Sequence, residues 1–311
     1  MVALRTLTTG DIPAVDPLLM AAYGNPRSFA ARLRRLLALE PAGWVLAEEP
    51  GAAGEKAEEE SPRPAGMGGL VVMGGTAYIG LVATDPGLQG RGVATQVMRR
   101  LIELARSRGC VRVLLDASAA GRPLYEKLGF VALDSVGLWE RPGARAGEAL
   151  VGSALVGVAG TTSLSDLGIA PGCRAAELPP DLIELDRRCW GDRRDRVIAS
   201  LAAEDPGRAF VFRLPDETMT GYAIYQGAAG ILGPVAALEA GSAESLIGRA
   251  LGAAGAEALA AYLPGANLEG ARILGAAGFR LSKSLTHMGL GSPLDPERRR
   301  LVYSQANFAL G

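Results

Sequence analysis

Residues 81–109 read LVATDPGLQGRGVATQVMRRLIELARSRG, and this stretch decides the fold. LVAT is a short apolar run that Asp85 and Pro86 end, which predicts a strand followed by a turn. From Val93 onward apolar residues recur at helical spacing with charged residues between them, and Gly109 is a natural helix terminator. The stretch therefore predicts a strand, a glycine-rich turn and one amphipathic helix.

The turn itself, QGRGVA at residues 89–94, suits an anionic ligand. Its glycines let the backbone approach a ligand closely, and the first free N–H groups of the helix point into the same space. The helix dipole and Arg91 add positive potential, as a pyrophosphate requires. The turn matches neither GxGxxG nor GxxxxGK[ST], and its pattern is Gln89-x-x-Gly92-x-Ala94.

This pattern resembles the acyl-CoA pyrophosphate loop, (Arg/Gln)-x-x-Gly-x-(Gly/Ala), of the GNAT superfamily of N-acetyltransferases. Two further marks follow the same family. The segment SAAGRPLYEKLGF, residues 118–130, is similar to the family's Asn-x-x-Ala-x-x-Leu-Tyr-x-x-x-Gly-Phe, with Ser118 where Asn is usual. The tripeptide at residues 82–84 occupies the position whose backbone, in the family, pairs with the pantetheine arm like an added strand.

The resemblance implies acetyl-CoA as the acyl donor and assigns residues to it. The expected cofactor-binding residues are Val82, Ala83, Thr84, Gln89, Gly90, Arg91, Gly92, Val93, Ala94, Thr95, Ser118 and Tyr125. In the family the acceptor amine attacks the thioester directly, so a proton must leave the ammonium and another must reach the departing thiolate.

Tyr125 matches the family's thiolate-protonating tyrosine, with packing against a sheet as the alternative role. The base is open among three candidates. Tyr78 falls where some relatives place a catalytic Glu on strand 4, while Glu48 and Asp85 could act through a water relay. Asp85 before Pro86 also suits a turn former, and Glu48 a solvated strand end.

The composition limits which binding partners and which cellular compartment we expect. A net charge of −1 over 311 residues gives no electrostatic case for nucleic acid or an anionic membrane. The polar start of the chain does not resemble a signal peptide, and the apolar run at 149–159 is too short to span a bilayer. Three unpatterned cysteines indicate reduced thiols in the cytoplasm, and one histidine without a Cys/His cluster makes a metal site unexpected. We expect a monomer or a homodimer.

The resemblance implies an α/β fold with a mixed, mainly antiparallel sheet, splayed at strand 4 and flanked by helices. The expected elements are a strand at 3–8, a helix capped at Asp11, a helix at 28–39, strands at 44–48, 69–73 and 77–84, the helix that starts at Val93, a strand at 111–117, a helix around Tyr125 and a strand at 131–139, with an acidic loop at 50–66. This order matches one GNAT domain over residues 1–142, here called the first copy.

A second copy of the same pattern follows at residues 172–291. Residues 118–130 align without gaps with 267–279, and a glycine-rich linker at 143–171 and a tail at 292–311 complete the chain. The second copy lacks the loop pattern: Glu239 and Glu244 would repel a pyrophosphate, and Leu274 stands where the first copy has Tyr125. We therefore expect a degenerate copy that does not bind acetyl-CoA, as in bacterial tandem GNAT proteins.

Three other residues have mainly structural interpretations. Asn267 is expected to cap a helix, His287 to be a structural residue of a late strand, and Trp190 to pack at a helix end. The charged run at 297–300 is expected to be the solvated face of a helix.

The sequence thus predicts an acetyl-CoA-dependent N-acetyltransferase acting on a primary amine of a small-molecule or peptide acceptor that the sequence does not identify. Two alternatives stay open at this point. One is an acyl-CoA-binding regulatory or scaffold protein without turnover. The other is an acetyltransferase resembling mycothiol synthase, which only the tandem layout supports.

Overall fold

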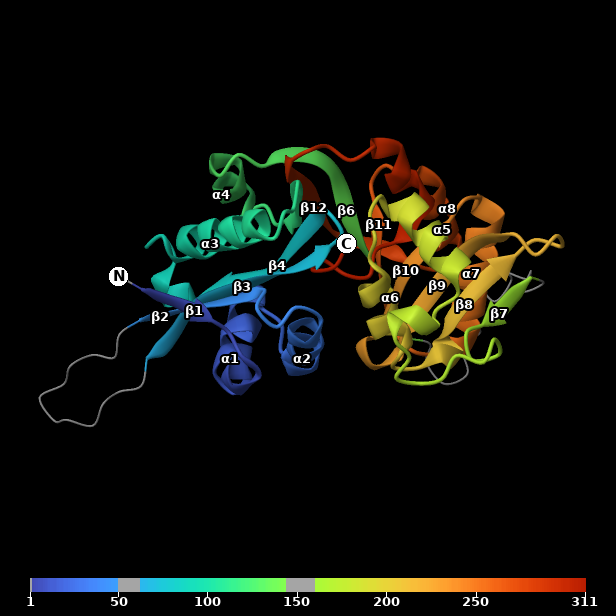
Figure 1. The fold of residues 1–311 in the computed structure, drawn as a ribbon, viewed down its shortest axis with the longest axis horizontal. Helices are drawn as coiled ribbons and strands as arrows, with labels where there is room; N and C mark the ends of the chain where they lie inside the picture. The colour runs from blue at the N-terminus through green and yellow to red at the C-terminus, as the bar shows by residue number, and fades with distance from the viewer. Residues whose placement is uncertain (1, 50–61, 144–159) are drawn as a thin grey trace, which may run out of the picture. The chain divides into compact units, whose positions relative to one another are not determined.

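The computed structural model describes residues 2–49, 62–143 and 160–311, and the chain divides into two compact units, Met1–Leu114 and Leu115–Gly311. Each unit combines strands with flanking helices, so the predicted mixed α/β architecture is confirmed (Figure 1). The apolar run at 149–159, most of the predicted acidic loop and most of the predicted linker lie outside the described residues.

The first unit is built around four antiparallel strands and the start of a fifth. Its elements are β1 (Ala3–Thr6), α1 (Ile12–Tyr23), α2 (Ala30–Leu39), β2 (Trp44–Glu49), β3 (Arg63–Met73), β4 (Thr76–Thr84), α3 (Val93–Ser107) and the beginning of β5 (Arg112–Ala117). The strands pair in the order β1-β2-β3-β4, and β5 adds parallel to β4. Helix α3 covers one face of this sheet, and α1 and α2 lie on the other (Figure 1).

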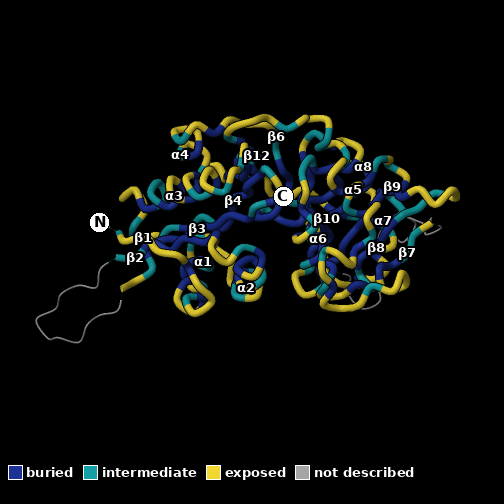
Figure 2. The backbone as a smooth tube through the Cα atoms, viewed as in Figure 1, coloured by how far each residue is buried: buried dark blue, intermediate teal, exposed yellow. Residues whose placement is uncertain are grey.

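Strand β3 is longer than the sequence predicted, and it is buried over most of its length (Figure 2). Residues 63–66 were expected to belong to the acidic loop. They are instead strand, because Arg63, Pro64 and Gly66 pair with β2, and Gly66 also pairs with Thr84 of β4. A side chain at Gly66 would place its Cβ 2.8 Å from Val93 Cγ1, so glycine there lets the start of α3 lie close to the sheet.

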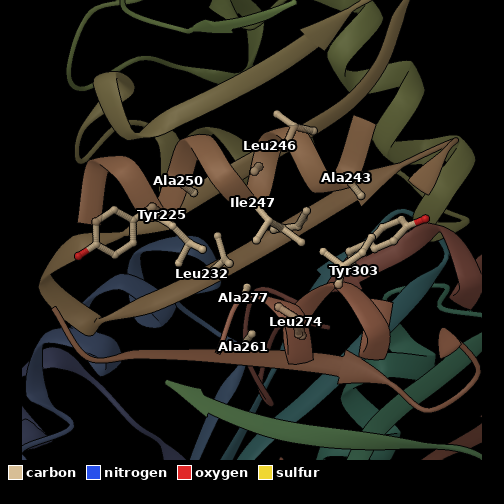
Figure 3. Packing of buried hydrophobic residues seen from close by; sticks show 14 of the residues in the cluster. Tyr225, Leu232, Ala243, Leu246, Ile247, Ala250, Ala261, Leu274, Ala277 and Tyr303 are labelled. Atoms are coloured by element: carbon tan, nitrogen blue, oxygen red, sulfur yellow. The ribbon is translucent and has the colours of Figure 1, made fainter. Parts of the chain in front are cut away.

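The second unit contains the rest of β5 and all later elements. These are α4 (Arg122–Lys127), β6 (Val131–Arg141), β7 (Thr161–Ser163), α5 (Pro180–Trp190), α6 (Asp195–Ala202), β8 (Ala209–Arg213), β9 (Met219–Gln226), β10 (Ile231–Ala237), α7 (Ala240–Ala254), β11 (Leu259–Pro264), α8 (Leu268–Ala276), β12 (Arg280–Gly291) and β13 (Val302–Ser304). Its core joins α7 and α8 to β9, β10 and β11, with Ile247, Leu274 and Tyr303 in one buried cluster (Figure 3).

Strand β6 explains why the compact units differ from the sequence repeat. It belongs to the first copy by sequence, yet it pairs antiparallel with both β11 and β12 of the second copy. Strand β7, within the predicted linker, likewise pairs with β8 of the second copy. The boundaries at 142 and 172 follow sequence similarity rather than compactness and stay a prediction.

The structure settles the smaller structural expectations. Asn267 caps α8 by accepting a hydrogen bond of 2.7 Å from the N–H of Gly270, as predicted. His287 is buried on β12 with its Nδ1 2.8 Å from Asp116, and burial lowers the pKa of this imidazole. The run at 297–300 is not simply a solvated face, because Arg299 donates a 2.6 Å hydrogen bond to Asp134.

Candidate active site

The turn between β4 and α3 presents free backbone donors. Gly92, the N-terminal flanking residue of α3, has a left-handed backbone with φ of +79°, and no side chain in the described part of the chain caps this helix end. The N–H groups of Val93, Ala94 and Thr95 form the first turn, where no carbonyl lies one turn earlier to accept them. Several N–H groups therefore point outward at the positive end of the helix dipole.

The surroundings of the turn are open. Gln89, Gly90, Arg91 and Gly92 are exposed, and a Cβ built on either glycine would meet no atom within 4 Å. The Arg91 guanidinium lies 3.9 Å from Glu49 and is two-thirds exposed, which makes this a weak surface pair. Space, donors and a cation are thus present together for an anionic group.

Strand β4 carries a bulge just before the predicted cofactor tripeptide. Leu81 has a φ of +53°, a strained conformation for a residue with a branched side chain, and the ladder with β3 shifts register at this point. The parallel ladder with β5 joins only Thr76, Ala77 and Tyr78 to their partners. Beyond Tyr78, β4 therefore leaves the β5 ladder, and Val82–Thr84 are not part of it.

One carbonyl of this tripeptide already has a partner that the sequence did not reveal. The Tyr23 hydroxyl, at the end of α1, donates a 3.2 Å hydrogen bond to the Val82 carbonyl oxygen. The Tyr23 ring is supported by Phe29, with ring centroids 5.6 Å apart. Nothing in the spacing of residues 23 and 82 indicates this contact, because it depends on how α1 packs against the sheet.

Tyr125 and Ser118 belong to the second unit. Tyr125 on α4 is buried and packs edge-on against Phe130, with ring centroids 6.1 Å apart, and burial raises its pKa to about 12. The phenol therefore keeps its proton across the physiological range. Ser118 is exposed, and its Oγ accepts a 3.2 Å hydrogen bond from the N–H of Gly121 in the turn that leads into α4.

The three candidate bases differ in how their side chains are held. Both carboxylate oxygens of Glu48 accept hydrogen bonds from Arg5, at 2.9 and 2.7 Å, and Arg5 also holds Asp11. Asp85 accepts a 2.8 Å hydrogen bond from the N–H of Gly87, as a turn former does. Tyr78 lies on β4 with 1% of its surface exposed. Each of the three has a structural role in the described fold.

Family comparison agrees with the motif and the repeat. A model of the acetyltransferase (GNAT) family matches residues 14–130, and a model of an acetyltransferase (GNAT) domain matches residues 182–304. The chain belongs to the GNAT family of acetyltransferases. It is an N-acetyltransferase with two GNAT domains in tandem, and acetyl-CoA is the donor that this family uses.

Curated relatives match part of the chain. The chain is 30% identical over 122 residues to a glucosamine 6-phosphate N-acetyltransferase of Trypanosoma brucei brucei, which spans 39% of this chain and 75% of that protein. It is 33% identical over 135 residues to glucosamine 6-phosphate N-acetyltransferase 1 of Oryza sativa subsp. japonica, spanning 41% of this chain and 77% of that protein. These similarities support transfer of an acetyl group to an amine.

Solved structures match both copies together. A candidate acetyltransferase of Pyrococcus horikoshii is similar over 100% of this chain and 96% of its own, with a TM-score of 0.78 and 24% identity. A GCN5-related N-acetyltransferase of Sphaerobacter thermophilus is similar over 93% and 95%, with a TM-score of 0.64 and 16% identity. At these identities the similarity shows the shared tandem fold.

The site residues predicted from the GNAT pattern fall into two groups. Those from Val82 to Thr95 are contiguous and lie together on β4, its turn and the start of α3 in the first unit. Ser118 and Tyr125 lie in the second unit, in the turn before α4 and on α4 itself. The assignment of each residue to the cofactor or to catalysis stays a prediction from the family pattern.

The described residues also bear on metals and membranes. Within residues 2–49, 62–143 and 160–311, no three His, Cys, Asp or Glu side chains gather in a way that could hold a metal ion. None of the helices in the described part of the chain has both the length and the apolar character needed to cross a membrane.

Proposed function

We propose that the first GNAT copy binds acetyl-CoA at the first turn of α3 and transfers its acetyl group to a primary amine. The observation that carries the proposal is the uncapped start of α3 behind Gly92, where several N–H groups and Arg91 surround open space. Such a helix start favours a diphosphate through direct hydrogen bonds and the helix dipole.

The strand edge supports the next step of the proposal. Val82–Thr84 would pair with the pantetheine arm, because β4 has left the β5 ladder by this point. The bulge at Leu81 interrupts the ladder with β3, so a backbone N–H of this bulge is our candidate donor to the thioester oxygen. An N–H aimed there stabilises the negative charge that develops when the amine attacks the thioester carbon.

Proton transfer completes the proposed reaction. Tyr125 would give its phenolic proton to the departing thiolate, and its protonated state at neutral pH supports this role. The attacking amine must also lose a proton. Because Glu48 and Asp85 are engaged by Arg5 and Gly87, we propose that water carries this proton out of the site.

The acceptor is proposed by chemical class. The two curated relatives are glucosamine 6-phosphate N-acetyltransferases, so that amino sugar phosphate is the first acceptor to test, followed by other small amines and peptide N-termini. Thiol release with one acceptor and none with the others would identify the class.

Isothermal titration with acetyl-CoA tests the site directly. We expect one site per chain, and at least 100-fold weaker binding in Gly92→Glu, because two like charges about 4 Å apart near a protein surface repel by about 4 kcal/mol. Gly109→Glu is the matched control. Gly109 also has a positive φ and open surroundings, and it follows the other end of the same helix, so this variant should bind normally. No binding by the unaltered protein, or equal loss in both variants, would reject the proposed site.

A further inference from the structure

The second copy repeats the strand opening of the first. By sequence alignment, β10 and β11 correspond to β4 and β5. The parallel ladder between β10 and β11 joins Ile231 to Ala260 alone. The antiparallel ladder between β10 and β9 then shifts register between Leu232 and Val235. Strand β4 likewise leaves β5 early and shifts register next to its bulge. In both copies the two parallel strands therefore share only a short ladder, and the strand edges beyond that ladder are here called the groove.

In the second copy the chain's own tail lies in this groove. Strand β13 pairs antiparallel with β10, with Ser304 opposite Val235 and Val302 opposite Ala236. The N–H of the next residue, Gln305, donates a 2.8 Å hydrogen bond to the carbonyl of Tyr262 on β11. The tail thus bridges the two strands that the opening separates, as an added strand does.

Asn267, at the start of α8, binds the tail through its side chain. Asn267 donates through its Nδ2 to the carbonyl of Val302 at 2.9 Å, while its Oδ1 caps the helix. This residue aligns with Ser118, at the position where GNAT proteins commonly carry Asn. The hydroxyl of Ser304 in turn accepts a 2.9 Å hydrogen bond from the N–H of Tyr262.

Apolar contacts bury the same segment. Residues 302–307 are all buried, and Tyr303 belongs to the core cluster that also contains Leu274 (Figure 3). Leu274 replaces the tyrosine that the first copy has at this position, so the groove presents an apolar surface there.

Buried polar groups hold the end of the segment. The side-chain amide of Gln226 donates to the carbonyl of Ala306 at 3.0 Å. The guanidinium of Arg194 donates to the main-chain oxygen of Gly311 at 2.8 Å, and Asp186 holds that guanidinium through both of its oxygens. Arg194 and Asp186 have 0% and 2% of their side chains exposed, so the hydrogen bond from Arg194 to Gly311 is shielded from water.

We propose that the second GNAT copy is a peptide-binding module, in which residues 302–311 of this chain occupy the groove that corresponds to the proposed pantetheine groove of the first copy. A peptide and a pantetheine arm offer the same amide groups to a strand edge, so a groove of this shape accepts either. The comparison with the first copy rests on the proposed function, whereas the peptide contacts are independent of it. With the tail in place, acetyl-CoA has no second site.

The main experiment separates a bound peptide from a fixed part of the fold. A protease recognition sequence is inserted at residues 292–293, which are exposed between β12 and the following turn. The intact chain is folded and purified, then cleaved. We expect the 294–311 fragment to stay bound through gel filtration and to exchange with an excess of the same synthetic peptide carrying a fluorophore.

Two matched changes define specificity in this experiment. A synthetic peptide carrying Ser304→Pro, which lacks a backbone N–H at the last residue of β13, should compete at least tenfold less well. Asn267→Ser in the groove keeps an acceptor for the helix cap but removes the donor to Val302, and should weaken the labelled peptide about tenfold. Failure of the labelled peptide to enter a folded, cleaved chain, or equal competition by both peptides, would overturn the proposal.

Hydrogen–deuterium exchange on the unaltered protein gives a second readout. The amides of residues 302–306 should be protected as strongly as those of β10, with no change when acetyl-CoA saturates the first copy. Deprotection of the tail by acetyl-CoA would mean that the cofactor enters this groove, which contradicts the proposal. A protein that binds no acetyl-CoA, yet keeps and exchanges its tail, would reject the proposed function alone.

Discussion

The phenol oxygen of Tyr23, in the last turn of α1, donates a 3.2 Å hydrogen bond to the carbonyl oxygen of Val82 on β4. The two residues are far apart in the sequence, and the contact fixes the direction of a carbonyl that we assign to the pantetheine arm. Tyr23 is 46% exposed, so the hydroxyl is accessible from solvent.

Replacing Tyr23 by Phe removes this hydrogen bond and keeps the ring contact with Phe29. We expect acetyl-CoA to bind about 2- to 10-fold more weakly, because one net hydrogen bond contributes about 0.5–1.5 kcal/mol. Titration calorimetry measures the change. Phe29→Leu, which removes the ring contact and keeps the hydroxyl, is the control, and an unchanged affinity in Tyr23→Phe would show that Val82 needs no such support.

Tyr125→Phe tests the proposed acid. We expect turnover to fall about 10²–10⁴-fold with little change in acetyl-CoA affinity, because only the proton for the thiolate is lost. With a pKa of about 12, the phenol stays protonated to strongly alkaline pH, so it should produce no alkaline loss of activity below about pH 11. Tyr262→Phe, another buried tyrosine packed edge-on against a phenylalanine, should keep normal turnover.

The candidate bases can be separated by pH profiles of kcat/KM. If water carries the amine proton, Glu48→Gln, Asp85→Asn and Tyr78→Phe should each leave the position of the acid limb unchanged. Glu48→Gln should also lower stability, because Arg5 loses a bidentate partner. A limb that moves or disappears in one variant alone would identify that residue as the base.

The buried pair of Arg194 and Asp186 should be important for stability. Asp186→Asn leaves a fully buried guanidinium without its counter-charge, for which we expect a loss of about 3–5 kcal/mol in the free energy of unfolding. Glu184→Gln on the same helix breaks an exposed pair with Arg187 and should leave the free energy of unfolding nearly unchanged. Urea titration of both variants makes the comparison, and equal losses would contradict it.

Asp11 should contribute to acid sensitivity. The Arg5 guanidinium holds the pKa of this carboxyl well below its usual range, helped by hydrogen bonds from Thr8. A depressed pKa in the folded state stabilises the protein above the unfolded value of about 4, and that stability is lost as the pH falls below it. Asp11→Asn should therefore be less stable at pH 7 but lose less stability between pH 5 and 2. Urea titrations across this range measure it, and Glu103→Gln on α3 should match the unaltered protein.

Short-range sequence patterns predicted most helices and strands, and the position of the candidate site residues from Val82 to Thr95. The strand, turn and helix at 81–109 appear as β4, the turn and α3, because apolar spacing and glycine act within a few residues. The alignment of residues 118–130 with 267–279 predicted α8 and its cap at Asn267, because a helix start is also set by neighbouring residues. Residues 63–66 were not predicted as strand, because Pro64 and Gly66 do not favour strands and extend β3 only through pairing with β2 and, at Gly66, with β4.

By itself, the sequence determined that this chain has two GNAT folds and that only the first carries the diphosphate-binding pattern. Only the tertiary structure decided that β6 pairs with β11 and β12, that Tyr23 reaches Val82, and that the tail lies between β10 and β11. The physical reason is distance along the chain. Helix periodicity and turn chemistry are local, whereas strand partners are chosen by edges that become neighbours only after the chain has folded.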